Sequence, residues 1–361
     1  MKTKMLMLST AIALTAGMAS AEDVRVYNWS DYIDEALLKK FTDETGYGLI
    51  YDVFDANEVL ETKLLAGGSG YDVVVPSGTF MQRQITAGAF QKLDKSKLPN
   101  LVNMWDLIAD RTAQYDPGNE YSINYMWGTT GIGVNVGKVQ EILGEDAPID
   151  SWSLVFDPAN MEKLAACGVH FLDAPAEMIP AALKYIGEDP DSHDPDVIAK
   201  VEAVYAAVRP YVRKFHSSEY IEALANGNIC VAVGWSGDIL QARDRAIEAD
   251  NDVEIAYHAP VEGAQMWFDQ LVIPVDAPNP EGAHAFLNFM MEPENAAASS
   301  NYVYYANGNK ASREFLAEDV IGDPAIYPDE ATLENLFTTT PYDTAVQRVV
   351  TRLWTKIKSG T

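Results

Sequence analysis

The organisation of this chain is clearest in Ile229-Cys-Val-Ala-Val-Gly-Trp-Ser-Gly-Asp238 and the segment directly after it, Ile239-Leu-Gln-Ala-Arg-Asp-Arg-Ala246. The apolar run at the start predicts a buried strand, and the second segment predicts a helix. Trp235 and Asp238 are therefore expected at a strand-to-helix turn. In α/β folds, such turns carry groups that bind ligands.

A tryptophan lies within three positions of an aspartate at three places: Trp29 and Asp31, Trp235 and Asp238, and Trp267 and Asp269. Three such pairs predict a pocket with flat apolar walls and acidic ends. That pocket suits an organic cation, because tryptophan is the best cation–π partner and a carboxylate accepts charge-assisted hydrogen bonds from an ammonium group. The alternative is that Asp31 and Asp238 only cap helices and that the tryptophans belong to the core.

The length of 361 residues favours two domains. The N-terminus combines Lys2 and Lys4 with an apolar run from Met5 to Met18 and the small residues Ala19-Ser20-Ala21. This pattern predicts a secretory signal peptide over residues 1–21, cleaved after Ala21. We therefore expect a soluble mature protein outside the cytoplasm.

The mature chain is strongly acidic. Without Lys2 and Lys4 it has 24 basic and 53 acidic residues, a formal charge of −29. This balance argues against nucleic acid as a partner, since binding nucleic acid requires a basic patch. It would attract small cations, although net charge can also serve solubility alone.

The chain has two cysteines, Cys167 and Cys230, both in apolar surroundings. In an oxidising compartment the simple expectation is one disulfide between them. A catalytic thiol is the alternative, but neither cysteine has a histidine in an evident catalytic motif.

The first part of the chain alternates predicted strands and helices, which indicates a parallel sheet with right-handed crossovers. The first predicted helix has Leu37, Leu38 and Phe41 on one face, and the second contains the apolar residues Val59, Leu60, Leu64 and Leu65. The predicted elements are Val24–Tyr27, Asp34–Thr45, Gly48–Phe54, Asn57–Ala66, Asp72–Val75 and Phe80–Thr86.

Two extended segments predict crossings between domains. The glycine-rich run Gly128–Asn135 would lead into a second domain, and Glu254–Pro260 would return from it. We expect a discontinuous first lobe of residues 22–125 plus 259–300. The second lobe would contain residues 126–258 plus 301–361, including the C-terminal segment.

The sequence contains no recognisable metal-binding, nucleophile-elbow or dinucleotide-binding motif. The five histidines are scattered without ligand spacing, so we expect no metal site. No Gly-x-Ser-x-Gly elbow or Rossmann glycine pattern occurs, so we expect no cofactor. A glycosidase pair of carboxylates cannot be judged from sequence, because it depends on their separation.

Distinctive motifs occur along the whole mature chain: Val26-Tyr-Asn-Trp-Ser-Asp-Tyr-Ile33, Asp52-Val-Phe-Asp-Ala-Asn-Glu-Val-Leu60, Tyr71-Asp-Val-Val-Val-Pro-Ser77, Leu93-Asp-Lys-Ser-Lys-Leu-Pro99, Phe171-Leu-Asp-Ala-Pro175, Phe215-His-Ser-Ser218 and Cys230-Val-Ala-Val-Gly-Trp-Ser-Gly-Asp238. These motifs resemble the periplasmic putrescine/spermidine-binding proteins of polyamine ABC importers. The likeness covers essentially the whole mature chain and is greatest for the putrescine-type branch, in which two cysteines lie at matching places and pair.

The resemblance implies an α/β fold of the type II periplasmic binding protein class. Its two α/β lobes are joined by crossover strands, with a ligand cleft between them, and close like a hinge. It further implies a non-enzymatic monomer in the periplasm that binds a polyamine, putrescine or spermidine or both. The closed form would deliver the ligand to an inner-membrane ABC permease.

The resemblance also assigns ligand-binding residues by position. Asp269 would bind one ammonium group, and Glu177 and Asp238 would bind the other. Ser30 and Asp31 would meet one end of the ligand, and Ser77 and Tyr305 would add polar contacts. The residues implied to line the methylene chain are Trp29, Tyr32, Trp235 and Trp267.

Two positions depart from the putrescine-type pattern. Trp267 stands where that branch has phenylalanine and the spermidine type has tryptophan, and Thr339 is polar where the putrescine type is apolar. Both are specificity candidates that would favour a longer ligand with a third amine. The alternatives are a binding protein for another organic cation and a secreted enzyme that acts on amines.

Overall fold

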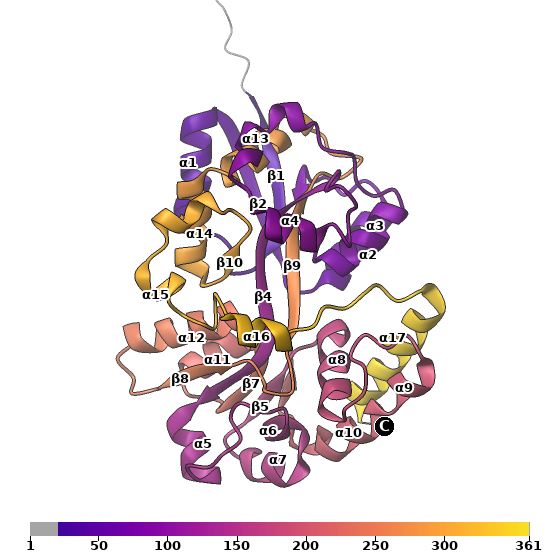
Figure 1. Ribbon diagram of the computed structural model, residues 1–361, viewed down its shortest axis with the longest axis vertical. Helices are drawn as coiled ribbons and strands as arrows, with labels where there is room; N and C mark the ends of the chain where they lie inside the picture. Colours follow the sequence, from indigo (N-terminus) through magenta and orange to yellow (C-terminus); the bar gives the residue numbers. More distant parts are fainter. Residues whose placement is uncertain (1–20, 361) are drawn as a thin grey trace, which may run out of the picture.

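The computed structural model describes residues 21–360, which form two lobes stacked along the long axis of the molecule (Figure 1). The predicted signal peptide, residues 1–21, lies outside the described residues apart from Ala21, where β1 begins. Among residues 21–360, no helix has both the length and the apolar character that a bilayer span requires.

The first lobe begins with alternating strands and helices, as the sequence predicted. β1 pairs in parallel with β2 on one side and with β3 on the other. The helix after β1 begins beyond Asp34, whose side chain accepts a hydrogen bond from the N–H of Ala36, and ends at Gly46 in the left-handed conformation (φ 77°). These elements are β1 (Ala21–Trp29), α1 (Glu35–Thr45), β2 (Tyr47–Phe54), α2 (Asn57–Ala66), β3 (Val73–Val74), α3 (Gly78–Thr86), η1 (Lys95–Lys97), η2 (Pro99–Asn103) and α4 (Asp106–Thr112).

The buried face of α2 is narrow. Leu60 and Leu64 are buried, but Val59 and Leu65 are 46% and 57% exposed. The predicted helix is confirmed, and only the stripe that carries Leu60 and Leu64 contacts the lobe.

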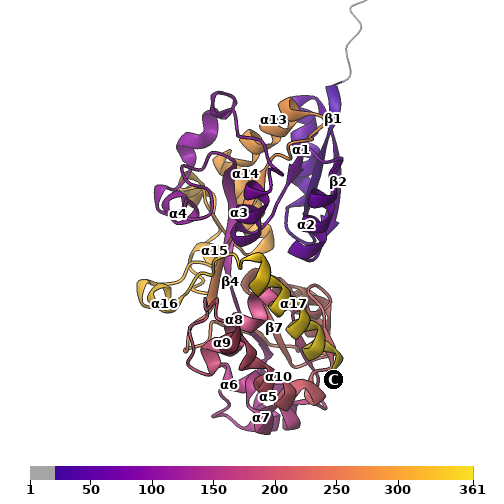
Figure 2. The ribbon, with the colours of Figure 1, turned by 90° about the vertical axis from the view of Figure 1, so that its right-hand side faces the viewer.

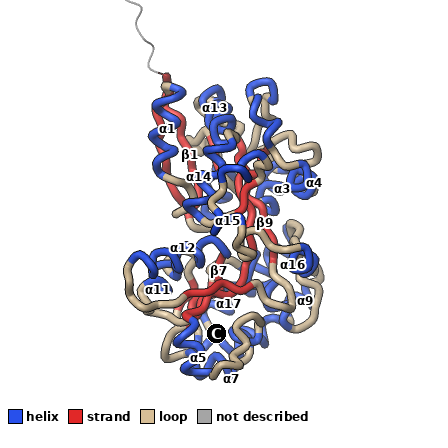
Figure 3. The backbone as a smooth tube through the Cα atoms, turned by 60° about the vertical axis from the view of Figure 1, so that its left-hand side comes forward, coloured by secondary structure: helices blue, strands red, loops and turns tan. Residues whose placement is uncertain are grey.

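Two long strands run between the lobes. β4 (Ser122–Asn135) is buried along its whole length. Its first part pairs antiparallel with β9 (Gln265–Val272), and its last residues pair with β7 and β8 of the second lobe. Figure 1 shows β4 and β9 passing from the upper to the lower half of the molecule, and β9 can be followed along the same path in Figure 3. The single sheet that results has the order β2-β1-β3-β9-β4-β7-β5-β6, with β10 and β8 also pairing with β4.

The segment Gly128–Asn135, predicted as the outward crossing, is the second half of β4. The prediction of Glu254–Pro260 as the return crossing is wrong. Residues of Glu254–Pro260 form β8, which pairs with Ile132–Asn135 inside the second lobe. The return is made by β9, which pairs with β4 and then, at Val272, with β3. Local pattern identified an extended segment in both cases but could not identify its partner.

The second lobe contains the predicted strand–turn–helix as β7 followed directly by α12. Its elements are α5 (Val136–Leu143), α6 (Ser153–Phe156), α7 (Pro158–Leu164), β5 (Val169–Phe171), α8 (Pro175–Tyr185), α9 (Pro195–Ala199), α10 (Val201–Val208), η3 (Arg209–Tyr211), β6 (Lys214–Phe215), α11 (Tyr220–Ala225), β7 (Val231–Trp235), α12 (Ser236–Glu248) and β8 (Ile255–His258).

The segment after β9 covers parts of both lobes (Figure 2). Its elements are α13 (Pro280–Met290), α14 (Pro293–Val303), β10 (Ala306–Asn307), η4 (Ala311–Phe315), α15 (Glu318–Ile321), α16 (Glu330–Asn335) and α17 (Thr344–Ser359).

Buried apolar side chains form two separate core clusters, one in each lobe. Trp235 and Tyr257 pack against both clusters and so lie at the joint. Val303 and Ile326 belong to the first cluster, whereas α17 packs in the second. We therefore propose that the chain up to Ile326 belongs with the first lobe, which changes the predicted assignment of residues 301–361.

Cys167 and Cys230 form a disulfide within the second lobe, with their Cα atoms 5.6 Å apart. The bond joins the residue directly before β7 to the segment that precedes β5. The prediction of one disulfide is confirmed.

Replacing Cys167 and Cys230 together by alanine should lower the free energy of unfolding by about 4 kcal/mol, because the bond joins positions 63 residues apart and closing a long loop removes much entropy from the unfolded chain. Urea unfolding followed by circular dichroism measures the loss. The parent chain treated with a thiol reductant is the matched control. Equal unfolding midpoints for the oxidised parent and the double variant would contradict this expectation.

Candidate functional site

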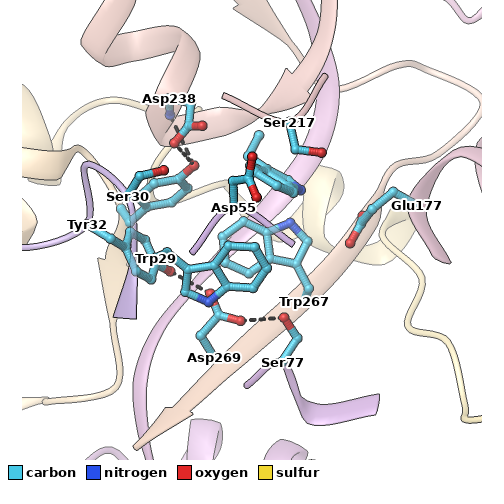
Figure 4. Close-up of a pocket in the computed structure, with 12 residues that line it drawn as sticks. Trp29, Ser30, Tyr32, Asp55, Ser77, Glu177, Ser217, Asp238, Trp267 and Asp269 are labelled. Carbon is cyan, nitrogen blue, oxygen red and sulfur yellow. Dashed lines mark hydrogen bonds between the residues drawn. The ribbon is translucent and has the colours of Figure 1, made fainter. Parts of the chain in front are cut away.

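A pocket of about 420 Å³, part of it open to solvent, lies at the joint between the lobes. Residues from both lobes line it, and Figure 4 shows Asp238 and Glu177 on opposite sides of the tryptophans. The lining residues are Trp29, Ser30, Tyr32, Asp55, Ser77, Glu177, Ser217, Trp235, Asp238, Trp267, Asp269 and Tyr305. The structure thus brings together all the predicted ligand-binding residues except Asp31.

Asp31 does not line the pocket, so the predicted contact of its side chain with a ligand is not supported by the geometry. It takes a left-handed conformation (φ 53°) just after β1. Its carboxylate is 41% exposed and forms an ion pair of 2.7 Å with Arg245. The side chain is therefore occupied by a basic residue outside the pocket.

Asp269 lies on β9 and forms the first-lobe acidic group of the pocket. Its carboxylate accepts hydrogen bonds from the hydroxyls of Ser77 (2.6 Å) and Tyr32 (2.8 Å). Burial raises its pKa to about 7, although these two hydrogen bonds favour the charged form. The side chain is 4% exposed, so its charge has lost almost all contact with water.

Asp238 has the corresponding position in the second lobe, in the first turn of α12. Its carboxylate accepts hydrogen bonds of 2.7 Å from the hydroxyls of Tyr220 and Tyr305. Burial raises its pKa to about 7. Because Asp238 binds two phenols and provides no side-chain cap for α12, the helix-cap interpretation is wrong for this residue.

Glycine is required beside Asp238. A Cβ atom at Gly237 would lie 2.4 Å from the ring of Tyr305. The missing side chain therefore lets this tyrosine reach across from the first-lobe cluster to Asp238.

Glu177 is the third buried carboxyl group and lies in the first turn of α8. It accepts a hydrogen bond from the hydroxyl of Thr130 on β4. Burial, together with smaller contributions from the nearby charges of Asp269 and Glu58, raises its pKa to about 7. Glu177 thus connects the second lobe to the crossing strand.

Aromatic rings form the walls between these carboxyl groups. Trp29 contacts Trp235 edge-on, with ring centroids 5.5 Å apart, and its indole N–H donates to the carbonyl of Val75. Trp267 lies 5.4 Å from Tyr305. A Cβ at Gly128 would lie 2.8 Å from Trp267, so glycine on β4 makes room for this ring.

Two buried polar atoms of the pocket have no hydrogen-bond partner among the described residues: the indole nitrogen of Trp267 and the hydroxyl of Ser217. Buried polar groups are normally paired. These atoms are therefore free to contact a ligand or an ordered water.

Sequence reasoning missed Asp55 and Ser217 as pocket residues. Both lie within motifs that carried the family resemblance, but each is a single polar residue in a loop with no local pattern that indicates a site. Thr339, predicted as a specificity residue, lines a neighbouring cavity instead. Its hydroxyl accepts a hydrogen bond of 3.2 Å from Gln265.

The pocket is acidic without a basic counter-charge. Its lining contains four carboxyl groups and no lysine, arginine or histidine. Buried carboxylates are costly unless they are paired with a cation. Among the described residues, no group of three or more histidine, cysteine, aspartate or glutamate side chains could hold a metal ion. The acidic groups and the aromatic walls together suit an elongated organic cation.

A pocket between two α/β lobes joined by crossing strands defines a solute-binding protein. The sequence family described as "Bacterial extracellular solute-binding protein" matches residues 36–328, and the chain belongs to this family. Members of this family bind solutes rather than transform them, so the prediction that the chain is not an enzyme is confirmed.

Three relatives illustrate the similarity. The putrescine-binding periplasmic protein SpuD of Pseudomonas aeruginosa is 53% identical over 360 residues, covering 99% of this chain and 98% of SpuD. The putrescine-binding periplasmic protein PotF of Escherichia coli is 48% identical, covering 98% of this chain and 97% of PotF. The solved structure of the spermidine/putrescine ABC transporter substrate-binding protein PotD from Streptococcus pneumoniae superposes with a TM-score of 0.74 at 30% identity, covering 94% of this chain and 99% of that one. The predicted fold class is confirmed.

The ligand-free protein should become less stable as the pH rises from about 5 to 8. Folding raises the pKa of Asp238, Asp269 and Glu177 to about 7, from about 4 in the unfolded chain. In this range the folded state holds more protons than the unfolded state, so raising the pH favours unfolding. Thermal unfolding at several pH values measures the slope.

The matched control for this effect is the double variant Asp238→Asn with Asp269→Asn, which removes two of the three titrating groups. Its unfolding temperature should change less between pH 5 and 8 than that of the parent. Identical slopes for the two proteins would contradict the assignment of the pH dependence to the pocket.

Proposed function

We propose that this chain is the periplasmic substrate-binding component of a polyamine ABC importer and that it binds putrescine in the pocket between its lobes. The observation that carries the proposal is the set of three buried carboxyl groups, Asp238, Asp269 and Glu177, in a pocket without basic residues. A diamine supplies two ammonium groups and an apolar chain, which match the carboxyl groups and the aromatic walls. The names of the relatives SpuD and PotF support the same ligand.

In this proposal Asp269 binds one ammonium group, and Asp238 and Glu177 bind the other. Ser30, Ser77 and Tyr305 add polar contacts, and Ser217 extends the predicted set because its hydroxyl is unpartnered. The methylene chain lies against Trp29, Tyr32, Trp235 and Trp267.

Lobe closure follows from the distribution of the carboxyl groups. Asp269 lies on the crossing strand in the first lobe, whereas Asp238 and Glu177 lie on helices of the second. Only a closed arrangement lets one small diamine reach all three. The closed form would then be recognised by an inner-membrane permease after the leader has been cleaved behind Ala21, and the protein would act as a monomer.

Spermidine is the second candidate ligand. Trp267 and Thr339 both favour it, as the sequence indicated, and the unpartnered indole nitrogen of Trp267 offers a donor for a bound water. An amino acid is a poorer fit, because its carboxylate would find no cation among the lining residues.

Titration calorimetry of the ligand-stripped mature protein tests this function. Putrescine, cadaverine, spermidine and spermine are titrated in turn, with arginine and glutamate as controls. Tight one-to-one binding of at least one polyamine and no heat from the controls is expected. No detectable binding of any of the four polyamines would overturn the proposal.

Asp269→Asn should weaken putrescine binding at least about thirtyfold, since loss of one partner from a buried charge pair costs about 2 kcal/mol or more. Asparagine keeps the shape and removes only the charge. Asp250→Asn, at an exposed position on the surface, is the matched control and should bind normally. Normal binding by Asp269→Asn would exclude the role given to this residue.

A further inference from the structure

A groove of about 1310 Å³, a volume that includes open solvent, lies between the lobes beside α17. Figure 2 shows α2 and α3 of the first lobe above α17 of the second lobe on this face of the molecule. We call this feature the α17 groove. The first lobe contributes Glu61 and Leu65 from α2 and Arg83 and Ala87 from α3, and the second lobe contributes Tyr342 and residues of α17.

Arg83 joins the two walls of the α17 groove. Its guanidinium binds Glu61 at 2.5 and 2.7 Å, and its remaining nitrogen donates to the side chain of Gln347 on α17 at 3.2 Å. The helices α2 and α3 pack in the core cluster of the first lobe, whereas α17 packs in that of the second. The hydrogen bond to Gln347 therefore requires the lobes to meet, and the groove is complete only in the closed arrangement.

The helix α17 is basic although the protein is acidic. It carries Arg348, Arg352, Lys356 and Lys358 and no acidic residue among its 16 positions, whereas the whole chain has 53 acidic and 26 basic residues. Lys356 and Lys358 lie in the last turn, where cations favour the helix dipole, and each forms an ion pair with a carboxylate. Helix stability and ion pairing therefore account for these two lysines.

Arg348 and Arg352 have no such explanation. Both are exposed and both line the α17 groove. Because they are four positions apart, they share one face of the helix. Within the described residues neither arginine forms an ion pair, and Arg352 donates to the backbone carbonyl of Arg348. Two cations without a counter-charge thus face a groove whose third cation, Arg83, is already balanced by Glu61.

Leu65 adds an apolar group on the opposite wall of the groove. Its side chain is 57% exposed, because α2 packs on the first lobe through Leu60 and Leu64 instead. A single exposed leucine is ordinary. Together with two unpaired arginines in one groove, it offers both charge and apolar contact, the combination found where proteins bind one another.

The charge of the α17 groove selects the kind of partner. Its lining contains three arginines, Glu61 and Asp343, and the carboxylate of Asp343 accepts hydrogen bonds from two N–H groups at the start of α17. The groove is therefore positive on a mature chain whose formal charge is −29. It favours an acidic partner. A second copy of this chain is disfavoured, because the two net charges repel each other.

We propose that the α17 groove is the surface on which the closed protein docks to its permease, and that the permease contacts Arg348 and Arg352 through an acidic segment. This inference rests on the proposed function, because it gives the permease a place on this chain. Since both lobes build the groove, the permease makes all of these contacts only after a ligand has closed the lobes. The ligand-free protein then competes poorly for the permease.

The test uses cells of the source bacterium that lack the gene for this chain and are complemented with the full chain or its variants. Uptake of radiolabelled putrescine is measured beside calorimetry of each purified mature protein. Arg348→Glu with Arg352→Glu should bind putrescine with the parent's affinity but lower uptake at least about tenfold, because like charges that face each other across an interface are strongly unfavourable. Arg348→Lys with Arg352→Lys keeps the charge and should retain most of the uptake.

The matched control is Lys138→Glu with Lys163→Glu, which makes the same change of charge at two exposed positions on α5 and α7. Its uptake should equal that of the parent. Leu65→Asp is an independent variant in the first lobe. It should lower uptake and spare putrescine affinity, because it places a negative charge on the wall that an acidic segment would contact.

Four results would overturn the docking surface and leave the proposed function standing. They are parental uptake by the Arg348→Glu, Arg352→Glu variant, an equal loss of uptake in the lysine control, a loss of uptake that only follows a loss of putrescine affinity, and arginine-dependent sedimentation of the protein with phosphatidylglycerol vesicles, which would assign the two arginines to lipid. A parent protein that binds no polyamine would overturn the proposed function itself.

Discussion

The structure depends on the burial of carboxyl groups that have no basic partner. Asp269, Asp238 and Glu177 are each less than a tenth exposed, and each accepts hydrogen bonds from hydroxyl groups: Ser77 and Tyr32, Tyr220 and Tyr305, and Thr130. Hydroxyls replace part of the lost hydration but bring no positive charge. The raised pKa values of the three carboxyl groups show that these hydrogen bonds do not fully offset the loss of hydration. A bound cation would supply the missing charge, so an energetic cost in the free protein becomes a driving force for binding.

The crossing strands β4 and β9 allow residues of both lobes to form this cluster of buried carboxyl groups. β4 and β9 pair through the joint, and they carry Thr130 and Asp269 to the place where α8 and α12 of the second lobe present Glu177 and Asp238. Close packing of these parts requires glycine at two points: Gly128 admits Trp267, and Gly237 admits Tyr305. The same geometry links binding to closure, because a ligand held by carboxyl groups from both lobes is fully satisfied only when the lobes meet.

The pattern of apolar residues and glycines within short segments correctly predicted individual strands and helices. The strand–turn–helix around Asp238 and the alternating elements of the first lobe followed from apolar periodicity and glycine. The return crossing did not, because β8 and β9 are both extended and only their partners distinguish them. In the site, the tryptophan–aspartate pairs located Asp238 and Asp269 but misplaced Asp31, which Arg245 neutralises from a distant part of the sequence. Glu177 came from the family resemblance alone, since its burial depends on contact with Thr130 on another element.

The measurement that tests the central claim most directly is the number of protons exchanged when putrescine binds. Binding heats are recorded near pH 7 in buffers with different heats of ionisation. If cations replace protons on the buried carboxyl groups, the pKa values fall on binding, and the heats will show net proton release that declines at pH 8.5, where these groups are already ionised. Tight putrescine binding with no proton release at pH 7 would contradict the account.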